Sequence, residues 1–348
     1  MIQTKLIAPL LVLLCFSTLL NAQNKPFQFQ QKAVRPGTKM SFSIPVTDGH
    51  NSTFIPVTVF NGKAPGKALG IVAGIHGFEY PPIVAAQQLA QSLDPAQMNG
   101  TLILVHMANV PAFLQRSVAL NQMDGKNLNR SFPGKASGTI TERMAYTIAN
   151  QIIARCDYVI DAHSGEANND LKPYAGYYNH TATPELSKKS RGFATALGFN
   201  YVIQFDNLPG VTEPSKYCSR EAVVRGIPAA DIECGRYGIA EPEMVNKVVT
   251  AYHNALNYLK ITNGTLGKVT PLYVRNRTFI NSNYDGFFYS RLKAGEFVKK
   301  GATLGYITNF FGNKIMDVQS PVDGIIMYMI STPPVNKTDE LFSIGHLN

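Results

Sequence analysis

The stretch Leu69-Gly-Ile-Val-Ala-Gly-Ile-His-Gly-Phe-Glu79 decides which fold we expect, because it joins a strand pattern to two chemically active side chains. Its first seven residues are an apolar run interrupted by glycine, which is typical of a buried strand. Pro81 and Pro82 follow, and the apolar positions of residues 83–93 fit a helix that proline can begin. His76 and Glu79 are therefore expected in a strand-to-helix loop, where open α/β sheets bind ligands.

These two residues carry groups that zinc binds well in proteins. Imidazole nitrogen and carboxylate oxygen are both zinc ligands, and catalytic zinc sites commonly combine two histidines, one glutamate and a water molecule. A His-x-x-Glu pair by itself is a weak motif, so a structural histidine beside a surface glutamate remains the alternative at this point.

The chain up to about residue 262 alternates strand and helix patterns. Residues 40–60 alternate apolar and polar side chains around Asp48-Gly49, as a hairpin does. Residues 166–183 are rich in turn formers and are expected to be irregular. The alternation predicts a mixed β-sheet covered by helices on both faces. Further strands are expected at residues 101–107, 158–161, 201–205 and 227–232, and helices at 141–155, 185–197, 219–225 and 243–259.

The composition changes after Thr262-Asn263-Gly264, and the remaining sequence has short strand patterns, turns and no helical period. We therefore expect three segments: a signal peptide at residues 1–22, a catalytic domain at 23–264 and a C-terminal β domain at 265–348.

The expected signal peptide has Lys5, the apolar run of residues 6–20 and the small residue Ala22 at a plausible cleavage point. A membrane anchor is the alternative, but Pro9 interrupts the run, which is short for a helix that spans a bilayer. We expect an exported protein, periplasmic or secreted, without stable membrane insertion.

The chain has a formal net charge of +9, with 45% hydrophobic and 16% charged residues, which is typical of an ordered globular protein. Its lysines and arginines are scattered, and no basic run is interleaved with aromatic residues. Nucleic acid is therefore not an expected partner, whereas a small anionic substrate fits the positive charge. The sequence leaves the oligomeric state open.

Two more expected strands end in residues suited to metal chemistry, His163 and Glu233. Two histidines and one glutamate leave one position on zinc open for water, and zinc lowers the pKa of that water to about 7. A carboxylate outside the ligand set, such as Glu233, can take the proton and pass it to a leaving amine. Asp161 either orients the imidazole of His163 or is a solvated turn residue.

Four motifs occur together and in one order: Gly-x-His-Gly-x-Glu at 74–79, Asn-Leu-Asn-Arg-x-Phe-Pro-Gly at 127–134, Asp-Ala-His-Ser-Gly at 161–165 and Ile-Glu at 232–233. In this combination the sequence resembles the succinylglutamate desuccinylase/aspartoacylase family of the zinc carboxypeptidase superfamily, over about residues 65–345. The resemblance implies a zinc-carboxypeptidase-like α/β fold with a small, barrel-like C-terminal all-β domain. It also implies one zinc ion per chain held by His76, Glu79 and His163, with Glu233 as the general base that activates zinc-bound water.

The same resemblance implies that Asn129 and Arg130 hold a substrate carboxylate, and guanidinium does form bidentate pairs with carboxylates. Arg220 lies near the position of another substrate-contacting arginine of the family. One departure stands out, because Gln122 occupies the position where aspartoacylase-like enzymes carry an arginine suited to stabilising the oxyanion. Arg116 is a candidate replacement. Loss of one oxyanion donor typically costs about 100-fold or more in rate.

The expected β domain resembles a biotinyl/lipoyl-type barrel, but the surroundings of Lys314 lack the pattern of a carrier lysine. We interpret the domain as a docking or lid module that narrows the active-site entrance, as the resemblance implies. Three cysteines follow the expected signal peptide. Cys218 and Cys234 are the nearest candidates for a disulfide, and Cys234 is an alternative nucleophile beside Glu233.

The function expected from these observations is an exported zinc hydrolase that cleaves the amide bond of an N-acyl amino acid or a similar small carboxylate-bearing amide. The alternative within enzymes is a zinc carboxypeptidase acting on peptides, including cell-wall peptides. A non-catalytic carboxylate-binding protein is the alternative from another class, although a binder has no need of Glu233.

Overall fold

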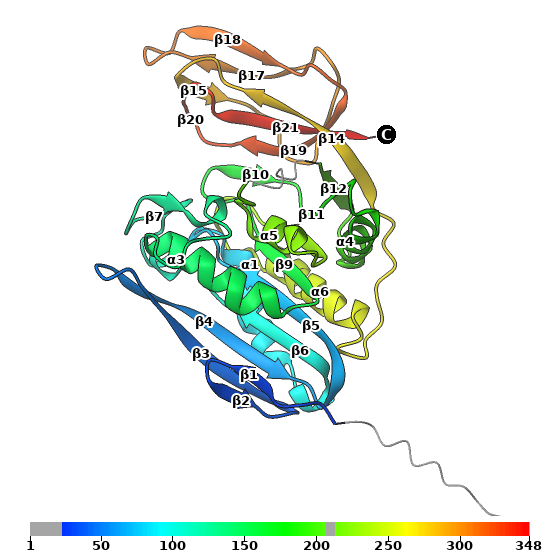
Figure 1. Ribbon diagram of the computed structural model, residues 1–348. Coiled ribbons are helices and arrows are strands. Elements are labelled where there is room, and N and C mark those ends of the chain that lie inside the picture. The colour runs from blue at the N-terminus through cyan, green and yellow to red at the C-terminus, as the bar shows by residue number, and fades with distance from the viewer. Residues whose placement is uncertain (1–22, 207–212, 348) are drawn as a thin grey trace, which may run out of the picture.

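The computed structural model describes residues 23–206 and 213–347, so the expected signal peptide lies outside the described residues. Within these ranges, no helix is long and apolar enough to cross a membrane. Figure 1 shows an α/β layer structure in the lower part of the molecule and antiparallel strands in the upper part.

One mixed sheet of thirteen strands runs through the described part of the chain, in the order β10-β19-β21-β14-β12-β11-β13-β9-β5-β6-β4-β3, with β16 paired to β19. Its centre is parallel from β13 through β9 and β5 to β6, and β11 runs antiparallel to β13. The strands of its α/β half are β3 (Thr38–Thr47), β4 (Ser52–Asn61), β5 (Ala64–Ala73), β6 (Asn99–Val105), β9 (Tyr158–His163), β11 (Tyr174–Tyr178), β12 (Tyr201–Phe205) and β13 (Ala229–Glu233).

Helices cover both faces of this half, which explains why its central strands are nearly continuous apolar runs. On one face, α1 (Tyr80–Ser92), α4 (Pro184–Ala196) and α6 (Pro242–Tyr258) pack on alternate residues of the strands, such as Ile71 and Ile160. On the other face, α3 (Ile140–Thr147) and α5 (Cys218–Val224) pack on the intervening residues, such as Val72 and Val159.

The C-terminal strands form a second apolar core while extending the main sheet. Four of them join the main sheet, and β10 (Asn169–Leu171) pairs with one of these, β19. Another four form a separate sheet in the order β18-β17-β15-β20. The strands are β14 (Leu272–Asn281), β15 (Gly286–Tyr289), β16 (Phe297–Val298), β17 (Thr303–Thr308), β18 (Lys314–Gln319), β19 (Gly324–Ile330), β20 (Pro334–Val335) and β21 (Glu340–Leu347).

Short elements complete the described chain. A small β1–β2 ribbon packs its Phe29 and Val34 into the core below α3, and β7 pairs with β8 in the loop that precedes α3. These elements are β1 (Phe27–Phe29), β2 (Lys32–Val34), α2 (Val110–Leu114), β7 (Leu120–Asn121), β8 (Lys126–Asn127) and the 3₁₀ turns Pro95–Gln97 and Leu128–Arg130.

The expected fold class is confirmed: a mixed sheet flanked by helices, with antiparallel β-structure at the C-terminal end. One local expectation holds in extent but not in helix type, and another was wrong. The helix expected over residues 141–155 ends as an α-helix at Thr147 and continues as a π-helical segment, Ile148–Ile152, and a 3₁₀ turn, Ile153–Arg155. Residues 166–183 are not all turns, because they contain β10 and β11, which form by pairing with strands distant in sequence.

Candidate metal centre

The candidate site lies where β5 and β9 end and α1 begins. Glu79 is the N-cap residue of α1, and its carboxylate makes no capping hydrogen bond, which leaves it free to face the histidines. Gly77 lies between His76 and Glu79, and a Cβ atom at this position would come within 2.2 Å of the Ala112 backbone. Glycine is therefore required for the loop to pack closely against α2.

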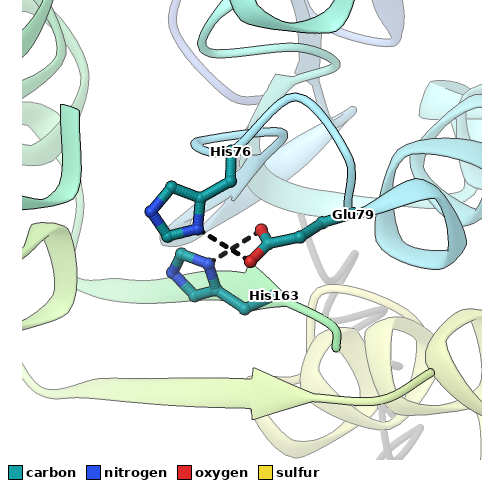
Figure 2. Close-up of side chains that lie close together, drawn as sticks. All are labelled: His76, Glu79 and His163. Atoms are coloured by element: carbon teal, nitrogen blue, oxygen red, sulfur yellow. Dashed lines mark hydrogen bonds and ion pairs between the residues drawn. The ribbon is translucent and has the colours of Figure 1, made fainter. Parts of the chain in front are cut away.

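Three side chains converge in this loop region, as Figure 2 shows. His76 Nδ1 lies 2.8 Å from Glu79 Oε1, and His163 Nδ1 lies 2.9 Å from Glu79 Oε2. One ligand atom from each of the three residues lies within 4.8 Å of the others. The sequence prediction that these residues are metal ligands therefore has the geometry it needs, with the two Nδ1 atoms facing one carboxylate.

The second ring nitrogen of each histidine, Nε2, also lies close to a side-chain oxygen. His163 Nε2 lies 2.9 Å from Asp161 Oδ1, and His76 Nε2 lies 3.2 Å from Asn127 Oδ1. The Asp161 contact is a close ion-pair distance without a hydrogen bond, whereas Asn127 Oδ1 is a hydrogen-bond partner of His76. An oxygen behind each ring favours an orientation in which the other nitrogen faces a metal. Asp161 therefore lies where the orienting interpretation expects it, whereas the sequence had not singled out Asn127.

The charges of the three residues compensate one another. Burial alone would raise the pKa of Glu79, but His163 and His76 lower it to about 2. Burial opposes the protonated form of His163, yet Asp161 and Glu79 raise its pKa well above the ordinary value. Burial also opposes the protonated form of His76, but the charge of Glu79 raises the pKa of His76 above its ordinary value. A buried carboxylate that is ionised and matched by two imidazoles is suited to a bound cation.

These residues fit a zinc ion in the chemistry of their donor atoms. Two imidazole nitrogens and one carboxylate form a donor set typical of catalytic zinc, and oxygen acceptors lie behind both rings. His76, Glu79 and His163 would hold the ion.

Glu233 lies at the end of β13, beside the cluster but outside it. It is paired in register with His163 on the neighbouring parallel strand. Burial raises the pKa of Glu233 well above its ordinary value; His163 opposes this shift, and the carboxylates of Glu79 and Glu166 add to it. The side chain makes no hydrogen bond with the described residues, so this carboxyl is suited to holding a proton.

Two more carboxyl groups near the cluster were not predicted as site residues. Burial, followed by the charge of Glu79, raises the pKa of Glu166 to about 7. Burial, followed by the charge of Asp161, raises the pKa of Asp231 to about 7, although Ser219 donates a hydrogen bond to it at 2.7 Å. Glu166 could have been singled out from the sequence, because His163 and Glu166 repeat the His-x-x-Glu spacing of the first motif.

The predicted arginines do not gather at one place. Arg220 and Arg130 flank the ring of Tyr217, with guanidinium carbons 5.8 Å and 4.6 Å from its centroid. Arg220 is only 8% exposed, and its buried Nε has no hydrogen-bond partner among the described residues. Arg130 is exposed and donates a hydrogen bond to its neighbour's carbonyl, Asn129 O. Arg116 is exposed in a left-handed conformation, with φ of 51°.

The side chains of Asn129 and Gln122 are engaged within the protein. Asn129 Oδ1 accepts a hydrogen bond from Cys218 N at the start of α5, and its Nδ2 lies 3.3 Å from His163 Nε2. Gln122 is exposed and donates a hydrogen bond to Ser117 Oγ at 3.3 Å.

The described cysteines Cys156, Cys218 and Cys234 are all free and buried, so the disulfide considered for Cys218 and Cys234 is not formed. Burial raises the pKa of the Cys234 thiol to about 12, which makes a thiolate nucleophile there unfavourable at neutral pH.

Comparisons with known proteins agree on one family and one fold. The sequence model described as "Succinylglutamate desuccinylase/Aspartoacylase catalytic domain" matches residues 65–259. An N-alpha-acetyl-L-2,4-diaminobutyric acid deacetylase from Halomonas elongata is 25% identical over 303 residues, covering 85% of this chain and 86% of that protein.

Two solved structures have the same fold at lower sequence identity. A succinylglutamate desuccinylase/aspartoacylase from Rhodobacter sphaeroides superposes with a TM-score of 0.81 at 23% identity, covering 94% of this chain and 99% of the other. The product-bound ectoine utilization protein EutE (DoeB) from Ruegeria pomeroyi superposes with a TM-score of 0.80 at 23% identity, covering 93% and 99%.

Proposed function

This chain belongs to the succinylglutamate desuccinylase/aspartoacylase family, and we propose that it is an exported, zinc-dependent hydrolase that cleaves the amide bond of an N-acyl amino acid or a similar small carboxylate-bearing amide. The observation that carries the proposal is the convergence of His76, Glu79 and His163, with Glu233 beside His163 on the next strand. The proposed export rests on the sequence of residues 1–22.

Zinc bound at such a site supplies Lewis acidity toward a carbonyl oxygen and lowers the pKa of water. The protein's own contribution is the placement of donors and of a proton carrier. Asp161 and Asn127 hold the two imidazoles in place, and Glu79 faces both of them.

Glu233 is the proposed general base. It takes a proton from the attacking water and delivers it to the nitrogen of the leaving amine, so that the C–N bond breaks and a C–O bond forms. Burial raises the pKa of Glu233, and this direction favours the second half of the exchange, in which the carboxyl gives its proton to the amine.

Arg220 and Arg130 are the proposed holders of the substrate carboxylate. Two guanidinium groups lie beside Tyr217, and neither forms an ion pair with a carboxylate of the described residues. A nearly buried guanidinium without an anion is costly, so this position favours an anionic ligand.

The Halomonas elongata relative supports a small substrate of this kind, since the compound in its name is an N-acyl amino acid. The experiment that tests the proposal is hydrolysis of a matched panel by the purified, zinc-loaded chain: N-acetyl and N-succinyl amino acids, N-acetyl-2,4-diaminobutyrate, the same amides lacking the carboxylate, and short peptides.

We expect cleavage of N-acyl amino acids, and at least tenfold lower kcat/KM for the analogues without the carboxylate. Preference for peptides would replace deacylation with a carboxypeptidase function. No cleavage of any amide would contradict the proposal.

A further inference from the structure

A cluster of exposed aromatic side chains lies on the small C-terminal sheet, at the upper end of the molecule in Figure 1. Phe287 and Tyr289 alternate with the core residue Phe288 along β15, so both point to the outer face of the sheet. Tyr306 on β17 is paired in register with Tyr289, and Phe310 packs edge-on against Phe287 at 5.9 Å. A contiguous group of exposed rings, unlike a single one, points to a binding surface.

The two tyrosines form one wall of a cleft. Their rings stack on each other, with centroids 5.1 Å apart and planes 22° from parallel, so each ring has a second face that the other does not cover. Both line a cavity of about 410 Å³, whose other walls include Arg291, Leu292 and Thr303. The cleft has room for a small ligand and combines flat apolar surface with polar groups.

The hydroxyl of Ser290 holds the cleft in shape. It donates a hydrogen bond to Leu304 O at 2.6 Å and accepts one from Leu292 N at 3.1 Å, which ties the segment after β15 to β17. The side chain of Leu292 also packs against the C-terminal core. The walls of the cleft are therefore ordered without a ligand, and this lowers the entropy cost of binding one.

The charge at the cleft is positive. Arg291 and Lys293 are exposed, and neither forms a salt bridge with the described residues. The two nearby carboxylates are engaged: Asp317, across from the tyrosine pair on β18, lies 2.9 Å from Lys314 Nζ, and Glu296 accepts a hydrogen bond from Lys293 N at 3.1 Å. The unpaired guanidinium and ammonium groups favour an anionic ligand.

Aromatic rings beside hydroxyl and guanidinium groups match the chemistry of an acidic sugar. One face of a pyranose ring presents C–H groups, which the electron-rich face of an aromatic ring attracts. The hydroxyl groups of a sugar can hydrogen-bond to the exposed hydroxyl of Thr303, and a sugar carboxylate can form a bidentate pair with Arg291.

We propose that this cleft binds an acidic oligosaccharide, with a sugar ring on the tyrosine pair and a sugar carboxylate at Arg291. This binding function goes beyond the proposed amide hydrolysis and does not depend on it. A second copy of this chain fits the face poorly, because a two-fold contact would bring Arg291 and Lys293 of one copy against the same cations of the other.

The test is binding of a uronic-acid tetrasaccharide to the purified protein, measured by titration calorimetry. We expect Tyr306→Ala to lower the affinity about tenfold, because it removes one of the stacked rings, and Arg291→Gln to lower it by a similar factor. The matched controls are Tyr146→Ala, as exposed as Tyr306 but on α3, and Arg35→Gln, exposed directly after β2. Both controls should bind as the wild type does.

The methyl ester of the same tetrasaccharide tests the charge of the ligand, because it keeps the sugar rings and lacks the carboxylates. We expect the ester to bind about tenfold more weakly and to be insensitive to Arg291→Gln. No binding of the tetrasaccharide would overturn the inference, as would equal affinity for the ester or affinity within twofold of wild type in both cleft variants.

Three other occupants of the face are outcomes that would also overturn the inference. They are binding of oligothymidylate only, binding of phosphatidylserine vesicles only, and a dimer without sugar affinity that Tyr306→Ala dissociates in sedimentation. Should Tyr306→Ala not fold, Tyr306→Leu keeps an apolar side chain without a flat ring and should show the same loss of affinity; wild-type affinity in that variant would contradict the stacking.

One further variant separates the cleft from the proposed catalytic site. Arg130→Gln should leave the affinity for the tetrasaccharide unchanged, because Arg130 lies beside Tyr217 and not in the cleft. A loss of affinity in Arg130→Gln equal to that in Arg291→Gln would place the sugar at the proposed substrate site and overturn the inference. A protein that binds the tetrasaccharide but cleaves no amide would overturn only the proposed hydrolysis.

Discussion

The buried carboxyl of Glu79 and a group of three half-buried carboxyls lie close together in this molecule and have opposite electrostatics. Glu79 faces two imidazoles, which hold its pKa at about 2. Glu233, Asp231 and Glu166 lie in the same region without a salt bridge to lysine or arginine among the described residues, and burial raises their pKa values. The difference teaches that neighbouring carboxyls of one site can be prepared for different tasks, the first for a cation and the second for protons.

Exchange of the proposed base for a neutral isostere should have the largest effect on turnover. Glu233→Gln removes the proton carrier and leaves the cluster intact, so we expect kcat to fall about a thousandfold with unchanged zinc content. Steady-state kinetics and elemental analysis check this. The control is Glu243→Gln, whose carboxylate is exposed and pairs with Lys247. Retained turnover in Glu233→Gln would assign the proton transfer to another group, with Glu166 the first candidate.

Removal of the proposed zinc ion should destabilise the cluster of Glu79 with His76 and His163. At zinc concentrations about a hundred times Kd, bound metal adds about 2.7 kcal/mol to the free energy of unfolding, so a chelator should lower the thermal midpoint by about 5 °C. Calorimetry with and without chelator measures this shift, and His163→Ala serves as the control that should not respond. An equal response in both proteins would place the metal elsewhere.

Loss of the acceptor behind His163 should weaken the cluster without abolishing it. Asp161→Asn removes the charge that lies 2.9 Å from His163 Nε2, so we expect zinc affinity to fall about 10- to 100-fold. Competition titration with a metal indicator measures the affinity. Asp157→Asn is the control, since Asp157 is exposed and pairs with Lys67. Unchanged affinity in Asp161→Asn would make the contact a feature of packing only.

Replacement of Glu142, a paired carboxylate far from the site, should have the smallest effect. The pKa of Glu142 is lowered, whereas that of the unpaired Glu233 is raised. Glu142 accepts a hydrogen bond from Thr139 N at 2.9 Å in the capping box of α3, and this bond, together with Lys126, lowers the pKa of Glu142. Glu142→Ala should cost about 1 kcal/mol of unfolding free energy at neutral pH.

Because the pKa of Glu142 is lower in the folded than in the unfolded chain, this stabilisation is present at neutral pH and is lost as the pH falls through the folded value. Denaturant unfolding of wild type and variant at several pH values should therefore show a difference that disappears in acid. Glu185→Ala, in the first turn of α4 without a capping hydrogen bond, is the control. A difference that persists in acid would contradict the pairing.

The parts of the site that the sequence predicted are those encoded locally. His76 and Glu79 are three residues apart in a strand-to-helix loop, and His163 directly follows a strand pattern, so spacing alone brought out these candidates. The sheet covered by helices on both faces followed in the same way, from apolar periodicity within single segments.

The parts that it missed depend on partners distant in sequence. The segment Asn168-Asn169-Asp170-Leu171-Lys172-Pro173 has the composition of a turn, yet it contains β10 and leads directly into β11, because β19 and β13 supply the hydrogen bonds of these two strands. Tyr174 gained its place beside Glu233 only through that register. The exposure of the two arginines could not be predicted from the sequence either: Arg220 is buried and Arg130 is exposed.

The measurement that tests the central claim most directly is the zinc content of the purified wild type, His163→Ala and His50→Ala, with amide hydrolysis assayed on the same samples. His50 is an exposed histidine in the turn between β3 and β4. We predict about one zinc per chain and activity in wild type and His50→Ala, and loss of both in His163→Ala. Full zinc content and activity in His163→Ala would contradict the account.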